Sequence, residues 1–231
     1  MKIGKLFKYD AISKFPNVIE HSFVTRVETQ CIASLHGLQT TPPNNIFEKK
    51  QPIILELGCG KGDYSLHLAK NNPQKNIIGV DIKGARIYHG ASFALENNIK
   101  NLIFLRISIE YIASFYSLHF PSSKIAEIWI NFPDPRSNRK SAALKRLTSP
   151  KFLQVYKSII QSDTILHLKT DSNDMYNYTL SVLNEDWHII EATDNLYGNN
   201  NLCPASEFQT DYEKRYLALG EKIKYIRFGL K

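Results

Sequence analysis

Short apolar runs alternate with longer amphipathic stretches from residue 53 onward. The runs are rich in Ile, Leu and Val and read IILEL, NIIGVD, NLIFLR, IAEIWIN and TILHLKT. Strands that are apolar along nearly their whole length, separated by segments of helical length, are typical of a parallel sheet covered on both faces. The pattern therefore predicts an α/β fold with a doubly wound, mostly parallel sheet.

The stretches between these runs are predicted to be helices. Asp63 opens the first and Ser149-Pro150 opens the fourth, because these residue types favour the first positions of a helix. The predicted helices cover 63–71, 83–97, 109–118, 149–161 and 172–183.

Two more apolar runs follow the regular alternation. They are WHIIEAT at 187–193 and KIKYIRF at 222–228, and the Gly/Asn-rich segment YGNNN lies between them. We expect this pair to join the far edge of the sheet, which brings it to seven strands. The alternating charges of KIKYIRF also fit an edge strand with one solvent-facing side.

Residues 1–50 lack a clear period and end in TTPPNN, a composition typical of an exposed linker. We therefore expect an N-terminal extension and linker over 1–50 and the α/β domain over 51–231. The chain has 231 residues, 43% of them apolar, which is enough for a substantial core. It has no apolar run of membrane-spanning length and no signal-peptide pattern, so we expect a cytoplasmic protein outside the membrane.

Three cysteines are widely spaced along the chain, at Cys31, Cys59 and Cys203. They form no CxxC pair and no Cys/His cluster, which favours reduced thiols and predicts neither a disulfide framework nor a metal site. The sequence is compatible with a monomer or a homodimer.

The formal charge of +7 is concentrated in two segments. Residues 136–146 and 214–231 each contribute +5, and the rest of the chain sums to −3. The first segment contains five cations and no acid: Arg136, Arg139, Lys140, Lys145 and Arg146. Local cationic patches of this kind are typical of a protein that binds a polyanion, although a charge run is often only a solvated surface.

A glycine-rich turn, LELGCGKGD, follows the first predicted strand and places Gly58, Gly60 and Gly62 before the first helix. A dinucleotide fingerprint would need its third glycine at position 63, where the chain has Asp63, so the spacing argues against NAD. The G-x-G-x-G spacing fits S-adenosylmethionine-dependent methyltransferases. Glu56 agrees with this reading, because a carboxylate repels a pyrophosphate but attracts a cationic ligand.

Acidic and polar residues also end the next predicted strands. Asp81 ends the second strand, where a carboxylate can accept hydrogen bonds from ribose hydroxyls. After the third strand, an adenine contact is expected among Arg106, Ile107 and Ser108. The glycine turn and Asp81 together predict a cofactor site much more strongly than a glycine turn alone would.

The fourth strand ends in NFPDP, in which Pro133 and Pro135 restrict the backbone around Asp134. Ligands of open parallel sheets bind at the carboxyl ends of the strands, so we expect this turn to face the transferable methyl group. Asn131 and Asp134 are candidates for holding the acceptor, and Asn131 also for contacting the cofactor.

Several collinear motifs between about Ile53 and Leu230 resemble the bacterial tRNA (guanine-N7)-methyltransferases. They are ELGCGKG, GVDIKGAR, IWINFPDP, KRLTS, HLKTDS, TDYEKRYLALG and IKYIRF, with weaker similarity in FPNVIEHSF. The resemblance implies a Rossmann-like class I fold, S-adenosylmethionine as cofactor, and tRNA as substrate. It implies transfer of a methyl group to N7 of the guanosine at position 46 of the variable loop.

The resemblance also implies the site residues. Cofactor contacts fall on Glu56, on Asp81 and around Asp134. The guanosine is met by Asp134, Asp171, Thr210 and Glu213, with Asn138 at a substrate position where many relatives carry lysine. The cations of 136–146 would follow the RNA backbone, and Lys222, Lys224 and Arg227 would widen that surface.

Guanine N7 has a lone pair and no proton, so its methylation needs alignment and charge stabilisation rather than a strong base. N7 lies in the deep major groove of A-form RNA, so the base must be unstacked or presented from a loop. Tyr212 and Tyr216 would then be available for stacking, although their helical spacing favours packing.

Three other functions fit parts of the sequence. An amino-methyltransferase of DNA or protein glutamine would carry an Asn/Asp-Pro-Pro-aromatic turn, whereas here Phe132 and Asp134 interrupt it. A non-catalytic RNA-binding module would not need the glycine turn with Glu56 and Asp81. A small-molecule methyltransferase leaves both basic segments unexplained.

Overall fold

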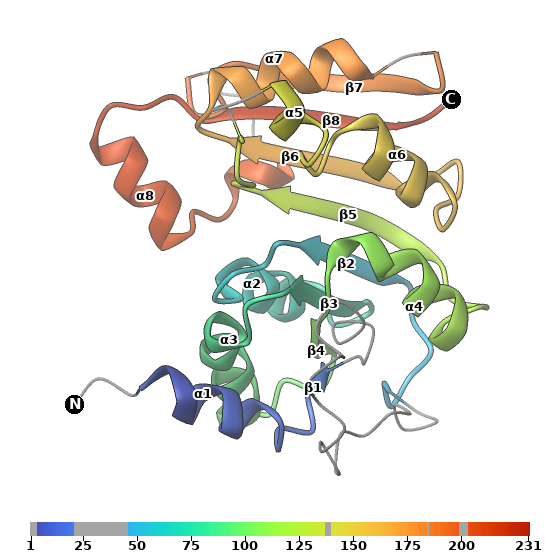
Figure 1. Ribbon diagram of the computed structural model, residues 1–231, viewed down its shortest axis with the longest axis vertical. Coiled ribbons are helices and arrows are strands. Elements are labelled where there is room, and N and C mark those ends of the chain that lie inside the picture. Colours follow the sequence, from blue (N-terminus) through green and yellow to red (C-terminus); the bar gives the residue numbers. More distant parts are fainter. Residues whose placement is uncertain (1–3, 21–45, 137–139, 184, 199–202) are drawn as a thin grey trace. The chain divides into compact units, whose positions relative to one another are not determined.

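The computed structural model describes residues 4–20, 46–136, 140–183, 185–198 and 203–231 (Figure 1). The chain divides into two compact units, unit 1 over Met1–Ser123 and unit 2 over Lys124–Lys231. Each unit is described by itself below.

Unit 1 is built on four parallel strands in the order β1-β4-β3-β2. The strands are β1 (Val18–Glu20), β2 (Ile53–Leu57), β3 (Asn76–Asp81) and β4 (Leu102–Arg106). The helices are α1 (Lys5–Ile12), α2 (Asp63–Asn71), α3 (Gly84–Glu96) and α4 (Ile112–His119), the last preceded by the 3-10 turn Ile109–Tyr111.

The core of unit 1 consists of the apolar runs recognised in the sequence. Every residue of β2 and β3 is buried, as expected for parallel strands covered on both faces. In the parallel register Leu57 lies beside Val80, and Asp81 lies beside Arg106. The carboxyl ends of β2, β3 and β4 therefore lie together at one edge of the sheet of unit 1.

Part of the N-terminal extension belongs to unit 1. Strand β1 pairs with β4, and Arg106 of β4 forms an ion pair with Glu20 at 2.7 Å. Helix α1 packs closely on α3, since a Cβ at Gly84 would lie 2.5 Å from Ile12. In the sequence, residues 5–20 were assigned only to the N-terminal extension, because they lack a clear hydrophobic period.

Unit 2 has four strands in the order β5-β6-β8-β7. They are β5 (Ile125–Asn131), β6 (Ile165–Thr170), β7 (Trp187–Thr193) and β8 (Lys224–Leu230). The helices are α5 (Lys140–Ala143), α6 (Pro150–Lys157), α7 (Asn173–Val182) and α8 (Asp211–Ala218), with a 3-10 turn at Pro204–Ser206. Helix α8 lies beyond the carboxyl ends of β5 and β6 (Figure 1).

Strand β8 lies between β6 and β7 and runs antiparallel to both. The expected pairing of the last two strands is confirmed, but the edge-strand reading of KIKYIRF is wrong, because β7 lies outside β8. The described residues contain eight strands where seven were expected, and the additional strand is β1. The α/β class with mostly parallel strands is confirmed.

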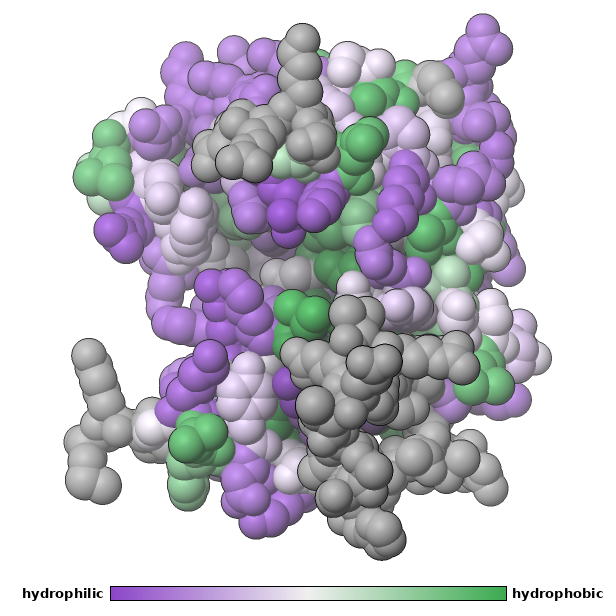
Figure 2. All heavy atoms as spheres, viewed as in Figure 1, coloured by the Kyte–Doolittle hydropathy of each residue, from purple (hydrophilic) through white to green (hydrophobic). Residues whose placement is uncertain are grey.

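The surface carries hydrophobic residues in small groups between hydrophilic ones on the visible face of each unit (Figure 2). Among the described residues, Leu6 of α1, Leu118 of α4 and Leu219 after α8 are the most exposed of the large apolar side chains. Within the described ranges, helices are too short or too polar to cross a bilayer.

Candidate active site

The glycine turn of unit 1 has the conformation that its sequence requires. Gly58, Gly60 and Gly62 all have φ between 58° and 83°, in the left-handed region that other residues avoid. The amides of Gly58 and Cys59 both donate to the carbonyl of Val80, at 2.8 and 3.0 Å, so the turn is fixed to the end of β3.

Two of these glycines serve different purposes. A Cβ at Gly62 would lie 2.6 Å from the Phe104 ring and 3.3 Å from Cα of Gly90, so this position needs glycine for packing. A Cβ at Gly60 would meet no atom within 4 Å. The backbone at Gly60 is therefore open to a ligand that approaches it closely, while Gly62, the N-cap of α2, packs against Gly90 of α3.

Two carboxylates flank the turn, and both are nearly buried. Asp81 accepts hydrogen bonds from the backbone amides of Gly60 at 3.0 Å and Lys83 at 2.7 Å. Glu56 accepts a hydrogen bond from the hydroxyl of Ser65 on α2. These contacts fix both carboxylates beside the turn, where the sequence places them.

The surroundings of Cys59 show that the electrostatic potential at the turn is negative. Its pKa is raised well above the ordinary value by burial, and further by the charges of Glu56 and Asp81. Two carboxylates acting on one buried point favour a positive ligand over an anion. The carboxylates of Glu56 and Asp81 thus fit the sulfonium and ammonium groups of S-adenosylmethionine and disfavour a pyrophosphate.

The three candidates after β4 have different environments. Arg106 pairs with Glu20 and lies 4.7 Å from the centroid of the Tyr9 ring. Ile107 is fully buried. Ser108 is half-buried with an extended backbone, and it is the candidate whose side chain best suits an adenine contact.

In unit 2, β5 ends at the buried Asn131 and leads into a tight turn over residues 132–136. Phe132 and Arg136 have φ of 48° and 46°, rare values for residues with side chains. The amide of Phe132 donates to the carbonyl of Lys169 at 2.8 Å, and that of Arg136 donates to Asp134 Oδ1 at 3.1 Å. The Asp134 carboxylate is held at the turn and remains exposed to solvent.

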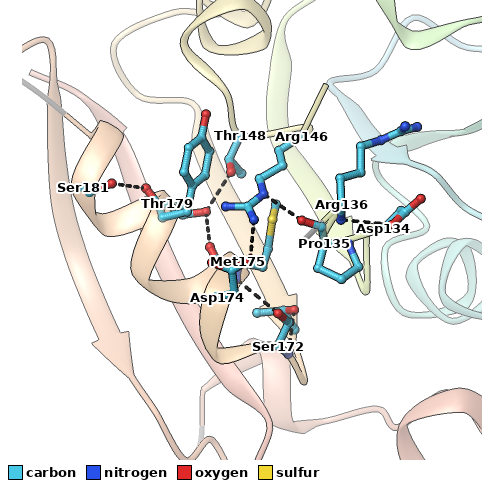
Figure 3. A network of polar contacts seen from close by, with 12 residues as sticks. Asp134, Pro135, Arg136, Arg146, Thr148, Ser172, Asp174, Met175, Thr179 and Ser181 are labelled. Atoms are coloured by element: carbon cyan, nitrogen blue, oxygen red, sulfur yellow. Dashed lines mark hydrogen bonds and ion pairs between the residues drawn. The ribbon is translucent and has the colours of Figure 1, made fainter. Parts of the chain in front are cut away.

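The side chain of Arg146 is hydrogen-bonded to the turn at residues 132–136. Its Nε donates to the carbonyl of Pro135 at 2.7 Å, and its Nη2 bonds to Asp174 of α7 (Figure 3). The guanidinium also lies 4.4 Å from the centroid of the Tyr178 ring, and the residue is only 4% exposed. A side chain that was expected on RNA is thus occupied within the protein.

The other cations of the first basic segment are placed differently from Arg146. Arg136 and Lys145 are exposed, and Lys140 begins α5. Asn138 and Arg139 lie outside the described residues. In the second segment, Lys224 is 4% exposed and donates to the carbonyls of Asp171 and Lys222.

The remaining predicted substrate residues come together in unit 2. Asp171 follows β6, and its Oδ2 lies 3.4 Å from the hydroxyl of Tyr212. Thr210 caps α8 in a reciprocal arrangement with Glu213, in which each side chain accepts from the other's amide. Glu213 is 0% exposed.

An aromatic cluster accompanies these residues. The Tyr212 ring stacks on Tyr216 at 4.4 Å and lies 5.0 Å from Phe132, measured between ring centroids. Tyr212 remains 43% exposed, so one side of the cluster is open to solvent. Burial raises the pKa of its hydroxyl, and the hydrogen bond with Tyr216 and the charge of Asp171 raise it further.

Sequence reasoning missed two residues of this region, Lys169 and Tyr197. Lys169 donates to Glu213 at 2.8 Å, and Tyr197 donates to the same carboxylate at 2.6 Å. Lys169 belongs to the run TILHLKT, and a lysine within a mostly apolar strand could have indicated a buried cation with a partner. Across the described residues, His, Cys, Asp and Glu form no group of three that could hold a metal ion.

Solved methyltransferases share this fold. The 16S rRNA methyltransferase KamB superimposes with a TM-score of 0.54 at 14% identity, over 78% of this chain and 87% of that chain. A Streptococcus mutans protein described as "a putative methyltransferase", solved in complex with SAH, gives a TM-score of 0.51 at 10% identity, over 79% and 90% of the two chains. These likenesses confirm the Rossmann-like class I methyltransferase fold.

Sequence comparisons identify the family. A family model described as "Putative methyltransferase" matches residues 50–226. The tRNA (guanine-N(7)-)-methyltransferase of Christiangramia forsetii is 44% identical over 99% of this chain and 98% of its own length. That of Porphyromonas gingivalis is 40% identical over 94% of this chain and 85% of its own. The chain belongs to the tRNA (guanine-N(7)-)-methyltransferase family.

Proposed function

We propose that this chain methylates N7 of the guanosine at position 46, in the variable loop of tRNA. Membership of the family supports the reaction and the substrate class, and the relatives carry that activity in their names. The observation that carries the proposal is the full-length similarity to such a relative together with the electronegative turn around Glu56 and Asp81.

S-adenosylmethionine, when bound, supplies an electrophilic methyl group on a sulfonium. In the proposal, Asp81 accepts from the ribose hydroxyls, and Glu56 compensates the positive charge of the cofactor. Gly58, Gly60 and Gly62 give the backbone close access. Ser108 is assigned to the adenine, and Asn131 to the cofactor as well. Support comes from the open space at Gly60 and from the half-buried hydroxyl of Ser108.

Asp134 is proposed as the group that meets the guanine. Its exposed carboxylate can accept from the N1 and N2 donors of the base and stabilise the positive charge that develops on methylation at N7. No proton needs to leave N7, so Asp134 acts by orientation and charge rather than as a base. The fixed turn at residues 132–136 supports this assignment, because it holds Asp134 against rotation.

Asp171 and Thr210 are proposed to complete the guanosine site, and Asn138 of the first basic segment is a further candidate. Tyr212 offers an exposed aromatic face beside Asp171, which suits an unstacked base. The exposed Arg136 and Lys145, with Arg139 and Lys140, would follow the phosphates of the same RNA. Activity on tRNA in the cytoplasm, as a monomer or homodimer, remains our prediction.

The direct test is transfer of a labelled methyl group from S-adenosylmethionine to unmodified tRNA. Cleavage chemistry specific for N7-methylguanine would locate the modified base. We expect label at the variable-loop guanosine and none in a tRNA whose position 46 is adenosine. Label at another base would overturn the position, and cofactor binding with no label in tRNA would overturn the substrate.

A further inference from the structure

Lys169, the fifth residue of β6, is a fully buried cation. Its Nζ donates to the carbonyl of Ala205 at 2.8 Å, to that of Phe208 at 3.2 Å, and to the carboxylate of Glu213 at 2.8 Å. One ammonium thus ties the segment 203–210 and the first turn of α8 to the end of a central strand of unit 2.

Glu213 is the counterpart of Lys169 and is equally buried. It also accepts from the Tyr197 hydroxyl at 2.6 Å and from the Thr210 amide at 3.4 Å. Burial raises the pKa of Tyr197, and the hydrogen bond to Glu213 adds to the effect. The Glu213 carboxylate is fully buried and engaged by three partners, so it presents no open surface to a substrate.

The backbone of Lys169 holds a third segment. Its carbonyl accepts from the amide of Phe132 at 2.8 Å, and this contact fixes the turn that carries Asp134. Asp171 follows two residues later, and Tyr212 of α8 reaches it at 3.4 Å. The segments that carry Asp134, Asp171 and Thr210 therefore all depend on one residue of β6.

Ion pairs without solvent contact are poor devices for stability alone, because desolvation of both charges offsets their attraction. An apolar pair could fill the same volume. Such a pair could not bind the carbonyls of Ala205 and Phe208 or the Thr210 amide. The segment 203–210, which leads into α8, would then lose the hydrogen bonds that fix its conformation. The buried pair therefore favours a role in geometry.

We propose that Lys169 is a positioning residue for guanosine recognition, acting through Glu213. The ammonium holds Thr210 and Tyr212 at a fixed place relative to Asp171, and the backbone of the same residue holds the Asp134 turn. This inference rests on the proposed function for its kinetic consequences, whereas its structural consequence can be measured without activity.

The test uses the double variant Lys169→Met/Glu213→Gln, because Lys169→Met alone would leave a buried carboxylate without its cation. We expect the double variant to fold and to exchange backbone amides in residues 203–214 at least about tenfold faster in hydrogen–deuterium exchange. The KM for tRNA should rise about tenfold or more, with kcat changed less and the dissociation constant of S-adenosylmethionine unchanged.

The matched control is Lys157→Met/Asp186→Asn, which removes an exposed ion pair of 3.0 Å in the same unit. Neither exchange in 203–214 nor KM should change in it. If Lys169→Met/Glu213→Gln does not fold, Tyr197→Phe removes one hydrogen bond to Glu213 and keeps both charges. It should raise exchange in 203–214 and the KM for tRNA in the same direction, by about threefold.

Normal exchange in 203–214 and normal KM for tRNA in a folded variant would overturn the inference. A rise in exchange with normal KM would overturn its role in recognition and leave Lys169 a structural residue. A wild-type protein that does not methylate tRNA would overturn the proposed function instead, and exchange would still report whether Lys169 holds α8.

Discussion

Arg146 donates a hydrogen bond from Nε to the carbonyl oxygen of Pro135 at 2.7 Å, within the turn that carries Asp134. The preceding residue, Lys145, is exposed. Two adjacent cations of one basic segment therefore have different environments, and they provide a matched pair for separating turn geometry from phosphate binding.

Replacement of Arg146 by methionine should destabilise unit 2 and slow methyl transfer. The carbonyl of the half-buried Pro135 would lose its charged donor, at about 1–3 kcal/mol, whereas Asp174 is 57% exposed and would stay solvated. We expect a lower melting temperature and a fall in kcat of about tenfold, with unchanged affinity for S-adenosylmethionine. Calorimetry and steady-state kinetics measure these quantities, and an unchanged kcat would count against control of the Asp134 turn.

Lys145→Ala should have the opposite profile. The side chain is exposed, so the melting temperature should stay the same. Loss of one phosphate contact should weaken tRNA binding and reduce the slope of log K against log salt by about 1. Filter binding over a range of salt concentrations tests this, and an unchanged slope would show that Lys145 does not meet the RNA backbone.

Asp134→Asn should separate catalysis from cofactor binding. The amide keeps the size of the side chain and removes its negative charge, so stabilisation of the positive charge on guanine would be lost. We expect kcat to fall about a hundredfold or more, while calorimetric affinity for S-adenosylmethionine stays within about twofold. An equal loss of cofactor affinity would make Asp134 a cofactor residue.

Alanine at Gly62 should be far more damaging to folding than alanine at Gly60. Both positions have positive φ, which costs roughly 1–2 kcal/mol for a residue with a side chain. At Gly62 the new methyl group would also meet Phe104 at 2.6 Å, while at Gly60 it would meet nothing within 4 Å. Thermal unfolding without cofactor should show this order, and equal losses would contradict the packing role of Gly62.

The buried thiol of Cys59 should make the protein less stable in alkali. Its pKa is raised in the folded state by burial, Glu56 and Asp81, so the unfolded chain loses this proton first as the pH rises. The unfolding free energy should be unaffected below about pH 8.5 and fall above it, by at most about 1.4 kcal/mol per pH unit. Cys59→Ala should remove this part of the slope in denaturant titrations at pH 8–10.

Strands β2, β3 and β4 of unit 1 and the glycine turn could be predicted from the sequence because their signals are local. IILEL and NIIGVD are wholly buried strands at the predicted positions. The position of β8 could not be predicted in the same way, since strand order depends on pairing between distant segments. Strand β1 has only three residues, too few for a period to be visible.

The cations of unit 2 show the main limit of reasoning from sequence. Arg146 and Lys224 were expected to contribute to the RNA-binding surface, yet both are buried and bind backbone carbonyls. Their partners are Pro135 and Asp171, which carry no sequence signal for such a contact. The position of Asp81 beside the glycine turn could be predicted because it depends on the end of a strand, which the sequence marks.

The location of β8 between β6 and β7 has a consequence for biosynthesis. Strands β6 and β7 are synthesised before residues 224–230, so each leaves the ribosome with one edge that lacks its native neighbour. The sheet of unit 2 is completed only when this late strand inserts between them, and the same insertion brings Lys224 to the carbonyl of Asp171. Assembly of the proposed guanosine-binding region is thereby delayed until residues 224–230 have been synthesised, whereas the four strands of unit 1 are available much earlier.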